Sequence, residues 1–341
     1  MIQDAPAGAT DTREIQRTRF LDAAGMSGAD VTAIAPDASF RRYFRVRLGG
    51  VSRLLMDAPP PRENAAAFAA VDDHLRTLGL TAPEILARDL DQGFLLLEDF
   101  GDDTFTRLLD KNHDAAVLYR LAVDTLVALN RHGEAALAAV PPYDLDALLT
   151  EAVLLPDWHF PLVHGRPVDS AERENYLDSW RDAFTALPPP ALTLVLRDFH
   201  VDNLMLTAGE PPRCALLDFQ DAVIGPAAYD LASLLQDARR DIDEDFEAGF
   251  VEYFLECMPM FDRENFLAWY HALAAQRHAK VLGIFSRLCL RDGKCHYLAH
   301  LPRVIRLLDR GCRRAGLQRL SDWLDRNLPA RSDYRPPETT L

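Results

Sequence analysis

The spacing of apolar residues changes part-way along the chain, and this change constrains the fold more than any other feature. Up to about residue 98, short segments such as 43–48 alternate apolar and polar residues, which is typical of strands with one buried face. From residue 104 onward, apolar residues recur at three- and four-residue spacing, which is typical of amphipathic helices. The sequence therefore predicts an α+β protein with two lobes, a small sheet lobe at 1–98 and a larger, mostly helical lobe at 99–341.

The first lobe contains the signals of a strand meander. Gly49-Gly50 is a turn signal between two strands, and the prolines at 59–61 must end the second of them because proline cannot donate to a β-ladder. The predicted elements are a helix at 13–24, strands at 31–36, 43–48, 51–58 and 94–98, and a helix at 64–78.

The second lobe is predicted to be helical apart from two short apolar strands, 192–196 and 214–217. Each strand ends in a charged cluster, so we expect a hairpin with acidic side chains along one rim. After the last helix we expect a loose, proline-rich tail. The predicted helices are 115–130, 145–154, 171–186, 229–238, 244–257, 263–289 and 301–314.

Composition excludes several classes of function. The 341 residues carry a net charge of −15, which disfavours nucleic-acid binding, and an anionic substrate would need a local basic pocket. No apolar run approaches the length of a membrane span, and the first residues lack a secretory apolar segment. The five cysteines contain no C-x-x-C pair and suggest neither a zinc site nor disulfides. We therefore expect a cytoplasmic protein that binds no membrane, and nothing here indicates its oligomeric state.

The charged clusters contain an arrangement suited to phosphoryl transfer. Asp198 and Asn203 share one loop, and Asp218 follows the next predicted strand, twenty residues after Asp198. Phosphoryl transfer needs an acceptor for the proton of the attacking hydroxyl and hard oxygen ligands for Mg²⁺. Asp198 can supply the first, and Asn203 and Asp218 can supply the second.

These motifs resemble those of aminoglycoside phosphotransferases, choline kinases and protein kinases. The resemblance rests on Arg197-Asp198 with Asn203, on Asp218-Phe219, on the hinge-like segment 94–101, and on 225–232. Leu196 stands where the family usually has histidine. The segments 37–44, 55–60 and 276–285 further resemble bacterial N-acetylmuramate/N-acetylglucosamine anomeric kinases, and the likeness covers about residues 14 to 315.

The resemblance implies a protein-kinase-like fold and ATP-dependent phosphorylation of the C1 hydroxyl of an amino sugar, a step in peptidoglycan recycling. It implies that Asp198 is the base or orienting acceptor, that Asn203 and Asp218 coordinate Mg²⁺, and that the backbone around Glu98 and Asp99 holds the adenine of ATP.

Two parts of the kinase pattern are missing. The loop 37–42 has no glycine, and Met56 stands near the position where kinases have a strand lysine that meets the phosphates. Because guanidinium groups bind phosphate oxygens in bidentate fashion, Arg41 and Arg42 are hypothesised to replace that lysine, with Ser39 adding a contact. Arg45 is a third nearby candidate. The alternative is that the two adjacent arginines are only solvated.

Several residues have two readings. His200 is expected to buttress the catalytic loop rather than to take part in chemistry, and Asp230 is either a helix N-cap or a brace for that loop. Asp221 stays undecided. Three cations in or near the predicted helix 263–289 are either surface residues or contacts for a sugar lactyl carboxylate, namely Lys280, Arg287 and Arg291.

Two other functions compete with the amino-sugar kinase. One is phosphorylation of an aminoglycoside or another small alcohol. The many acidic residues of the chain favour this alternative, because a cationic antibiotic would bind in an acid-lined pocket. The other is a pseudokinase that binds a nucleotide or a partner without turnover. The absence of the strand lysine and of the glycine-rich loop favours this alternative. The intact set of Asp198, Asn203 and Asp218 disfavours the second.

Overall fold

The computed structural model describes residues 7–34, 41–137 and 139–328. The chain forms two compact units. The first comprises Met1–Asp114 with Asp202–Asp221, and the second comprises Ala115–Val201 with Ala222–Leu341. These two units are divided by the compactness of the chain. The two predicted lobes, with a boundary at residue 98, were defined by function. The lobe assignment therefore stays a prediction.

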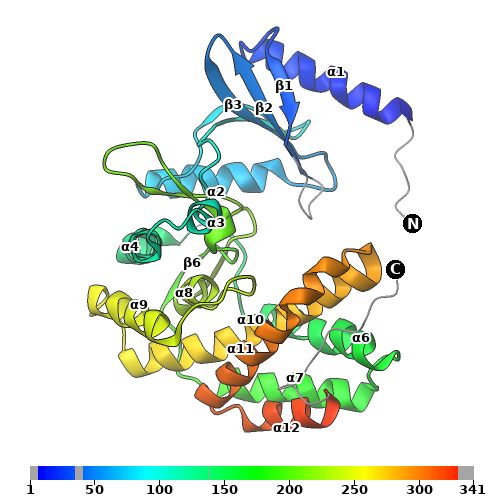
Figure 1. The fold of residues 1–341 in the computed structure, drawn as a ribbon, viewed down its shortest axis with the longest axis vertical. Coiled ribbons are helices and arrows are strands. Elements are labelled where there is room, and N and C mark those ends of the chain that lie inside the picture. The colour runs from blue at the N-terminus through cyan, green and yellow to red at the C-terminus, as the bar shows by residue number, and fades with distance from the viewer. Residues whose placement is uncertain (1–6, 35–40, 138, 329–341) are drawn as a thin grey trace. The chain divides into compact units, whose positions relative to one another are not determined.

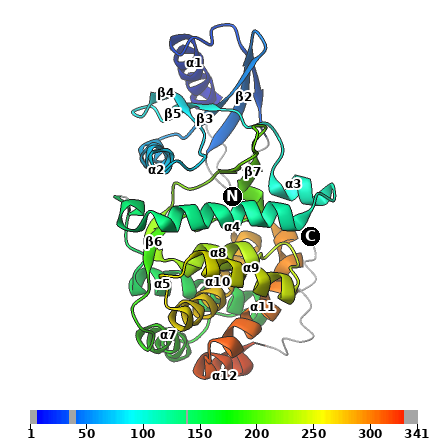
Figure 2. The same cartoon turned by 90° about the vertical axis from the view of Figure 1, so that its left-hand side faces the viewer.

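The first unit is built on a five-stranded antiparallel sheet with the order β1-β2-β3-β5-β4. Figure 1 labels its first three strands, and Figure 2 labels β4 and β5. Gly49 and Gly50 both have positive φ, of 57° and 83°, which lets two residues reverse the chain between β2 and β3 as predicted. Strand β4 was not predicted. The strands are β1 (Asp30–Ala33), β2 (Arg42–Leu48), β3 (Val51–Asp57), β4 (Ile85–Asp89) and β5 (Phe94–Glu98).

Helices cover this sheet because each strand carries apolar side chains. Phe20, on helix α1 (Ala7–Ala23), stacks on Phe94 of β5 with ring centroids 5.5 Å apart. Helix α2 (Ala65–Thr77) begins where the side chain of Asn64 accepts a hydrogen bond from the Ala67 backbone N–H, a standard N-cap. Figure 2 shows α1 and α2 on the two sides of strands β4 and β5. The short α3 (Phe105–Asp110) follows.

The predicted hairpin between 192–196 and 214–217 is wrong. Strand β8 (Cys214–Leu216) pairs instead with β7 (Leu204–Leu206), and β6 (Leu192–Val195) pairs with β9 (Val223–Pro226). The physical reason is that the three residues of β7, taken for loop in the sequence, offer β8 a nearer partner and cost less loop-closure entropy.

The second unit is mostly helical, as predicted, and is organised around the 30-residue helix α10. A Cβ at Gly283 of α10 would lie 2.3 Å from the carbonyl carbon and oxygen of Leu154, so only glycine allows this approach to the π-helical turn Leu155–His159. The helices are α4 (Ala115–Arg131), α5 (Leu145–Ala152), α6 (Phe160–His164), α7 (Ser170–Thr185), α8 (Ala228–Leu235), α9 (Glu244–Cys257), α10 (Arg263–Asp292), α11 (Leu301–Arg314) and α12 (Gln318–Asn327).

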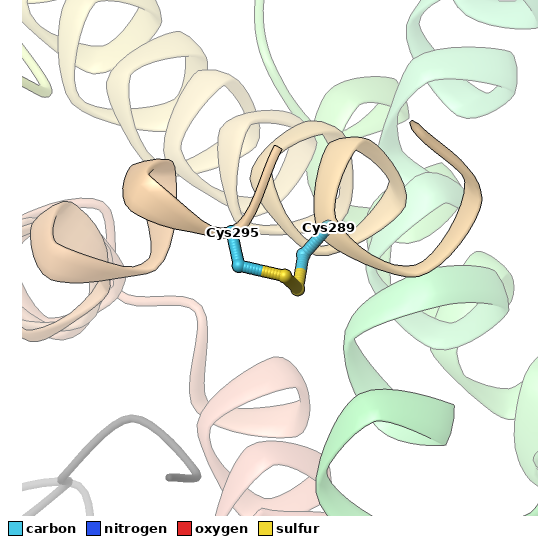
Figure 3. The surroundings of a disulfide bond; sticks show 2 residues. All are labelled: Cys289 and Cys295. Atoms are coloured by element: carbon cyan, nitrogen blue, oxygen red, sulfur yellow. A yellow bond between two sulfur atoms is a disulfide. The ribbon is translucent and has the colours of Figure 1, made fainter. Parts of the chain in front are cut away.

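Two expectations about the C-terminal part were wrong. Helix α12 lies within the stretch expected to be a loose tail, and it is held by Trp323, which is 1% exposed and whose indole N–H donates to the Glu172 carbonyl at 2.8 Å. Cys289 and Cys295 form a disulfide across the end of α10 (Figure 3). Spacing alone did not indicate it, because the end of the helix turns the chain back within six residues.

Within the described residues, no helix is both long and apolar enough to cross a membrane. The α+β fold class is confirmed, with a small antiparallel sheet near the N-terminus and a mostly helical remainder.

Candidate active site

The loop that carries Asp198 begins directly after β6, and Asp230 binds its backbone. The Asp230 carboxylate, only 3% exposed, accepts the backbone N–H groups of Leu196 at 2.6 Å and Arg197 at 2.9 Å. Asp230 lies inside α8, whose N-cap is Ala227. Of the two readings of Asp230, the structure therefore supports the brace.

A buried charge cluster surrounds the next residue of the loop. Glu151 of α5 receives hydrogen bonds from the Arg197 guanidinium, from Lys280 Nζ at 2.8 Å, and from the Tyr143 hydroxyl. Arg197 has φ +69°, a left-handed conformation that non-glycine residues adopt mainly where their surroundings hold them. Glu151 thus fixes both the side chain and, indirectly, the backbone of the residue before Asp198.

Positively charged side chains around the loop determine the charge state of Asp198. Burial by itself raises the pKa of Asp198, but Lys280 and Arg277 oppose it, with smaller contributions from His200 and Arg197, and the pKa is lowered. Asp198 is therefore anionic at neutral pH. It can orient a hydroxyl from the start and can accept its proton as the hydroxyl becomes acidic during attack on phosphorus.

His200 fits the structural reading. It is 7% exposed, and its backbone N–H donates to the Asp198 carbonyl at 3.1 Å. Burial lowers the pKa of His200 and so disfavours the charged form of its imidazole.

The two predicted Mg²⁺ ligands flank the β7–β8 hairpin of the first unit. Asn203 immediately precedes β7, and the Leu217 N–H donates to its carbonyl at 3.0 Å, so Asp218 follows one residue later on the opposite strand. Asp218 has φ +57°, again left-handed. The hairpin that brings Asn203 and Asp218 to one end is β7–β8, whereas the predicted hairpin paired 192–196 with 214–217. Both arrangements place these two residues at one end of a hairpin.

Arg41 pairs with Asp218. Its Nη2 lies 2.9 Å from Asp218 Oδ1, and its Nε lies 3.5 Å from Glu63 Oε2. Gln220 adds a hydrogen bond to the same Asp218 oxygen at 3.1 Å. An arginine that enters from the residue before β2 therefore links a predicted metal ligand to a carboxylate at the start of α2.

The other two candidate arginines are engaged differently. Arg42 Nη2 lies 2.6 Å from Asp57 Oδ2, and Arg13 binds the other oxygen of that carboxylate, which is fully buried. Arg45 binds Asp99 at 2.8 Å and Asp102 at 3.0 Å. Both side chains stabilise the packing of the sheet and its connections. The phosphate role of Arg42 stays a prediction, whereas the geometry favours Arg41.

The predicted adenine-binding segment has ordered polar contacts. The Glu98 N–H donates to the Glu84 carbonyl at 2.9 Å, and the Glu98 carboxylate accepts the Glu84 N–H at 3.2 Å. The Asp99 carboxylate is bound by Ser52 Oγ at 2.5 Å and by Arg45. These contacts involve side chains that shape the segment, and the role of its backbone stays a prediction. Ser39 lies outside the described residues.

Asp198 belongs to the second unit, whereas Asn203, Asp218 and Arg41 belong to the first. The chain passes from one unit to the other between Val201 and Asp202, five residues or fewer from both Asp198 and Asn203.

Sequence reasoning missed Glu151 and Glu63. Glu151 lies within a predicted helix, and nothing in its neighbourhood marks it as the partner of a lysine 129 positions away. Glu63 did have a signal, because it immediately precedes a predicted helix and kinases pair their phosphate-binding cation with a helix glutamate.

Comparison with known proteins identifies the family. The model of the phosphotransferase enzyme family, APH, matches residues 30–270, which is more than half of the chain. The chain belongs to the phosphotransferase enzyme family. Its members are phosphotransferases, and the loop, hairpin and brace described above lie within the matched residues.

Relatives of this phosphotransferase share one name. An N-acetylmuramate/N-acetylglucosamine kinase of Caulobacter vibrioides is 33% identical over 93% of this chain and 97% of its own length. Proteins of the same name from Neisseria meningitidis and Pseudomonas aeruginosa are each 37% identical, over 84% and 87% of this chain and 86% and 88% of their own lengths.

Solved structures confirm the kinase-like fold. A choline/ethanolamine kinase family protein from Mesorhizobium loti has a TM-score of 0.62 at 15% identity and covers 91% of this chain and 98% of its own. A microcompartment-associated aminopropanol kinase has a TM-score of 0.63 at 12% identity and covers 91% and 99%. At this identity the likeness establishes the fold alone.

Proposed function

We propose that this phosphotransferase transfers the γ-phosphate of ATP to the C1 hydroxyl of N-acetylmuramate and N-acetylglucosamine, and so serves peptidoglycan recycling in the cytoplasm. The observation that carries the proposal is the agreement of relatives at 33–37% identity, aligned over more than four fifths of both chains, on this pair of substrates. The intact loop around Asp198 supports catalysis rather than binding alone.

Asp198 receives the proton of the sugar hydroxyl. Its carboxylate is anionic because the neighbouring cations outweigh burial, so it accepts a hydrogen bond from the hydroxyl before the reaction. Asp230 and Glu151 hold the loop, which keeps the carboxylate in place without reorganisation during transfer. In phosphoryl transfer such positioning supplies much of the rate enhancement.

The residues at the β7–β8 hairpin fit a magnesium ion. The Asn203 amide and the Asp218 carboxylate offer the hard oxygen donors that Mg²⁺ prefers, and the Asp218 side chain is 40% exposed, which leaves room for a ligand. When bound, Mg²⁺ would supply positive charge that offsets the negative charge of the phosphates. Asn203 and Asp218 are the residues that would hold it.

Arg41 is proposed to take the place of the missing lysine. In kinases that cation meets the phosphates and is paired to a helix glutamate. Arg41 has a comparable partner in Glu63, which directly precedes the N-cap of α2, and it already contacts the carboxylate that would hold the metal. Met56, at the usual position of the lysine, is fully buried and apolar. The backbone near Glu98 and Asp99 is proposed to hold adenine, with Ser39 and Arg42 as further candidate contacts of the nucleotide.

The test is an assay of ADP release with purified protein, Mg-ATP and one acceptor at a time: N-acetylmuramate, N-acetylglucosamine or kanamycin. We expect turnover with both amino sugars, loss of turnover in Asp198→Asn, and a product whose phosphorus NMR signal couples to the anomeric proton. Phosphate on any other hydroxyl would refute the C1 assignment.

Other outcomes identify the competing functions. Turnover of kanamycin alone would make the protein an antibiotic kinase. Silence with all three acceptors, together with a rise in melting temperature on adding Mg-ATP, would indicate a nucleotide-binding protein without this activity, since a ligand of the native state raises its apparent stability.

A further inference from the structure

Four cations follow one face of helix α10. Arg277, Lys280, Arg287 and Arg291 are separated by three, seven and four residues, which is the spacing of a single helical face. Ile284 occupies the same face between Lys280 and Arg287 and is half-buried. We call these four residues the cationic face. Its first two members, Arg277 and Lys280, lower the pKa of Asp198, so this end of the face lies near the reacting hydroxyl.

Three members of the cationic face already interact with carboxylates of the protein. Lys280 Nζ donates to Glu151 at 2.8 Å, and Arg291 binds the adjacent Asp292 through two hydrogen bonds of 2.7 and 2.8 Å. Arg277 interacts electrostatically with Asp198 and Asp230. Their charges are therefore largely balanced within the protein.

Arg287 is different. Like Arg277, it forms no hydrogen bond and no ion pair with the part of the chain that the structure describes, and its Nε is buried without a partner. Arg277 acts on Asp198 and Asp230, whereas the carboxylate that acts on Arg287 is Asp292, which Arg291 already binds. Burial lowers the pKa of Arg287, and the neighbouring Arg291 lowers it further, with only a weaker opposing effect from Asp292. A guanidinium that is partly desolvated beside a like charge is costly unless an anion binds to it.

The geometry of the helix sets a distance for that anion. Seven residues at 1.5 Å each place Arg287 about 10 Å along α10 from Lys280. Long side chains on a helix generally point back toward its N-terminus, so we expect the Arg287 guanidinium on the side of Ile284 and Asp198. The remaining gap suits an acceptor the size of one sugar with a carboxylate on an ether arm.

Another group of arginines in the second unit is a weaker candidate. A cavity of about 510 Å³ near the start of α9 is lined by Arg303, Arg306 and Arg310. Arg303 binds Asp241 through two contacts of 2.7 Å, and Arg310 binds Glu247 at 2.5 Å. Arg303 and Arg310 are therefore already paired with carboxylates, which an anion would have to displace.

We propose that Arg287 binds the lactyl carboxylate of N-acetylmuramate, and that this residue decides how well the enzyme uses N-acetylmuramate relative to N-acetylglucosamine, which has no carboxylate. The proposal rests on the proposed function, because it assumes amino-sugar acceptors whose C1 hydroxyl is at Asp198. Arg287 is then a specificity residue that takes no part in the transfer itself.

The experiment compares kcat/KM for the two sugars in the wild type, Arg287→Gln and Arg287→Lys. Loss of a charge-assisted hydrogen bond at a partly exposed site is expected to lower kcat/KM for N-acetylmuramate about ten-fold, mainly through KM. Turnover of N-acetylglucosamine should change less than about two-fold, because no interaction with it is lost. The lysine variant should recover part of the activity on N-acetylmuramate.

Two controls distinguish recognition from structural damage. Arg291→Gln, on the same face but paired with Asp292, should leave the ratio of the two sugars unchanged. N-acetylmuramate with its carboxylate converted to an amide should be equally good for the wild type and Arg287→Gln. An equal loss on both sugars in Arg287→Gln, or no change in their ratio, overturns the proposal, whereas a wild type inactive on both sugars overturns the proposed function itself.

Discussion

The carboxylates of the two units meet their cations in different ways. Asp218, in the first unit, has a side chain that is 40% exposed and that pairs with the guanidinium of Arg41. Glu151, in the second unit, has a side chain that is 11% exposed and accepts from both Lys280 and Arg197. The Asp218 carboxylate is open enough to accept another ligand, whereas the contacts of Glu151 cannot be opened without leaving charge buried on both sides.

This difference matches the two tasks of a phosphotransferase. The side that would receive Mg²⁺ and phosphates needs a carboxylate and a cation that can both turn to an incoming ligand. The side that receives a proton needs a base whose position stays constant through the reaction. The comparison predicts that substitutions near Asp218 change the dependence on ligands, and that substitutions near Asp198 change the rate or the stability of the fold.

The largest effect is expected from Asp218→Asn compared with Asp198→Asn. Both should lower kcat about a hundred-fold or more, since one removes metal charge compensation and the other the proton acceptor. Only Asp218→Asn should raise the Mg²⁺ concentration needed for half-maximal rate. The measurement is a Mg²⁺ titration of ADP release, and an unchanged Mg²⁺ requirement in Asp218→Asn would remove this residue from the metal site.

The next largest effect is on stability, in Glu151→Gln. The change leaves Lys280 and Arg197 without their carboxylate, which is expected to cost about 3 kcal/mol of unfolding free energy. Denaturant unfolding measures it. Glu252→Gln, which removes an exposed partner of Arg263, is the matched control and should change stability little. Equal effects of the two variants would show that the Glu151 cluster is no more important than a surface pair.

Arg41→Gln tests the proposed substitute for the lysine. Loss of a guanidinium on phosphate oxygens should lower kcat/KM for ATP by about 10- to 100-fold, with little loss of stability. Arg42→Gln should mainly lower stability and should change kcat/KM for ATP less than Arg41→Gln does, because it leaves the buried Asp57 with Arg13 alone. Kinetics with varied ATP and a melting curve for each variant distinguish them. If Arg42→Gln carried the kinetic defect, the roles of the two arginines would have to be exchanged.

The smallest expected effect is on the pH dependence of stability. It comes from Asp72 of α2, which belongs to neither the Asp218 contact nor the Glu151 cluster. Burial raises its pKa from 3.8 to about 7, and both its oxygens are buried without a hydrogen-bond partner among the described residues. Between those pH values the folded protein binds more protons than the unfolded chain, so stability is greatest at the acid end and falls as pH rises from about 4 to 7.

Asp72→Asn should remove this slope, and should be more stable than the wild type by roughly 1–2 kcal/mol at pH 8 and about equal at pH 4. Asp73→Asn, which removes an exposed partner of Arg88, should leave the slope in place. Unfolding free energies at several pH values measure both variants. A wild-type slope that survives in Asp72→Asn would assign it to another group.

Much of the fold was predictable because its signals are local. Alternation and helical spacing predicted strands β2, β3 and β5 and most of the long helices within one to three residues, including α9 and α11 with both ends correct. Strand β4 and helix α12 were missed, since the first alternates weakly and the second follows a glycine in a polar stretch. The pairing of β8 was predicted wrongly because three-residue strands leave almost no pattern.

The sequence by itself determined which residues are available for chemistry, because Asp198, Asn203 and Asp218 occur in order on one short stretch after an apolar strand. Tertiary structure alone decided their partners. Arg41 meets Asp218 across 177 positions, and Lys280 meets Glu151 across 129. Such pairs depend on how elements far apart in the sequence pack. Arg41 and its neighbour Arg42, at the start of β2, likewise bind different carboxylates, Asp218 and Asp57, which only the packing around each side chain decides.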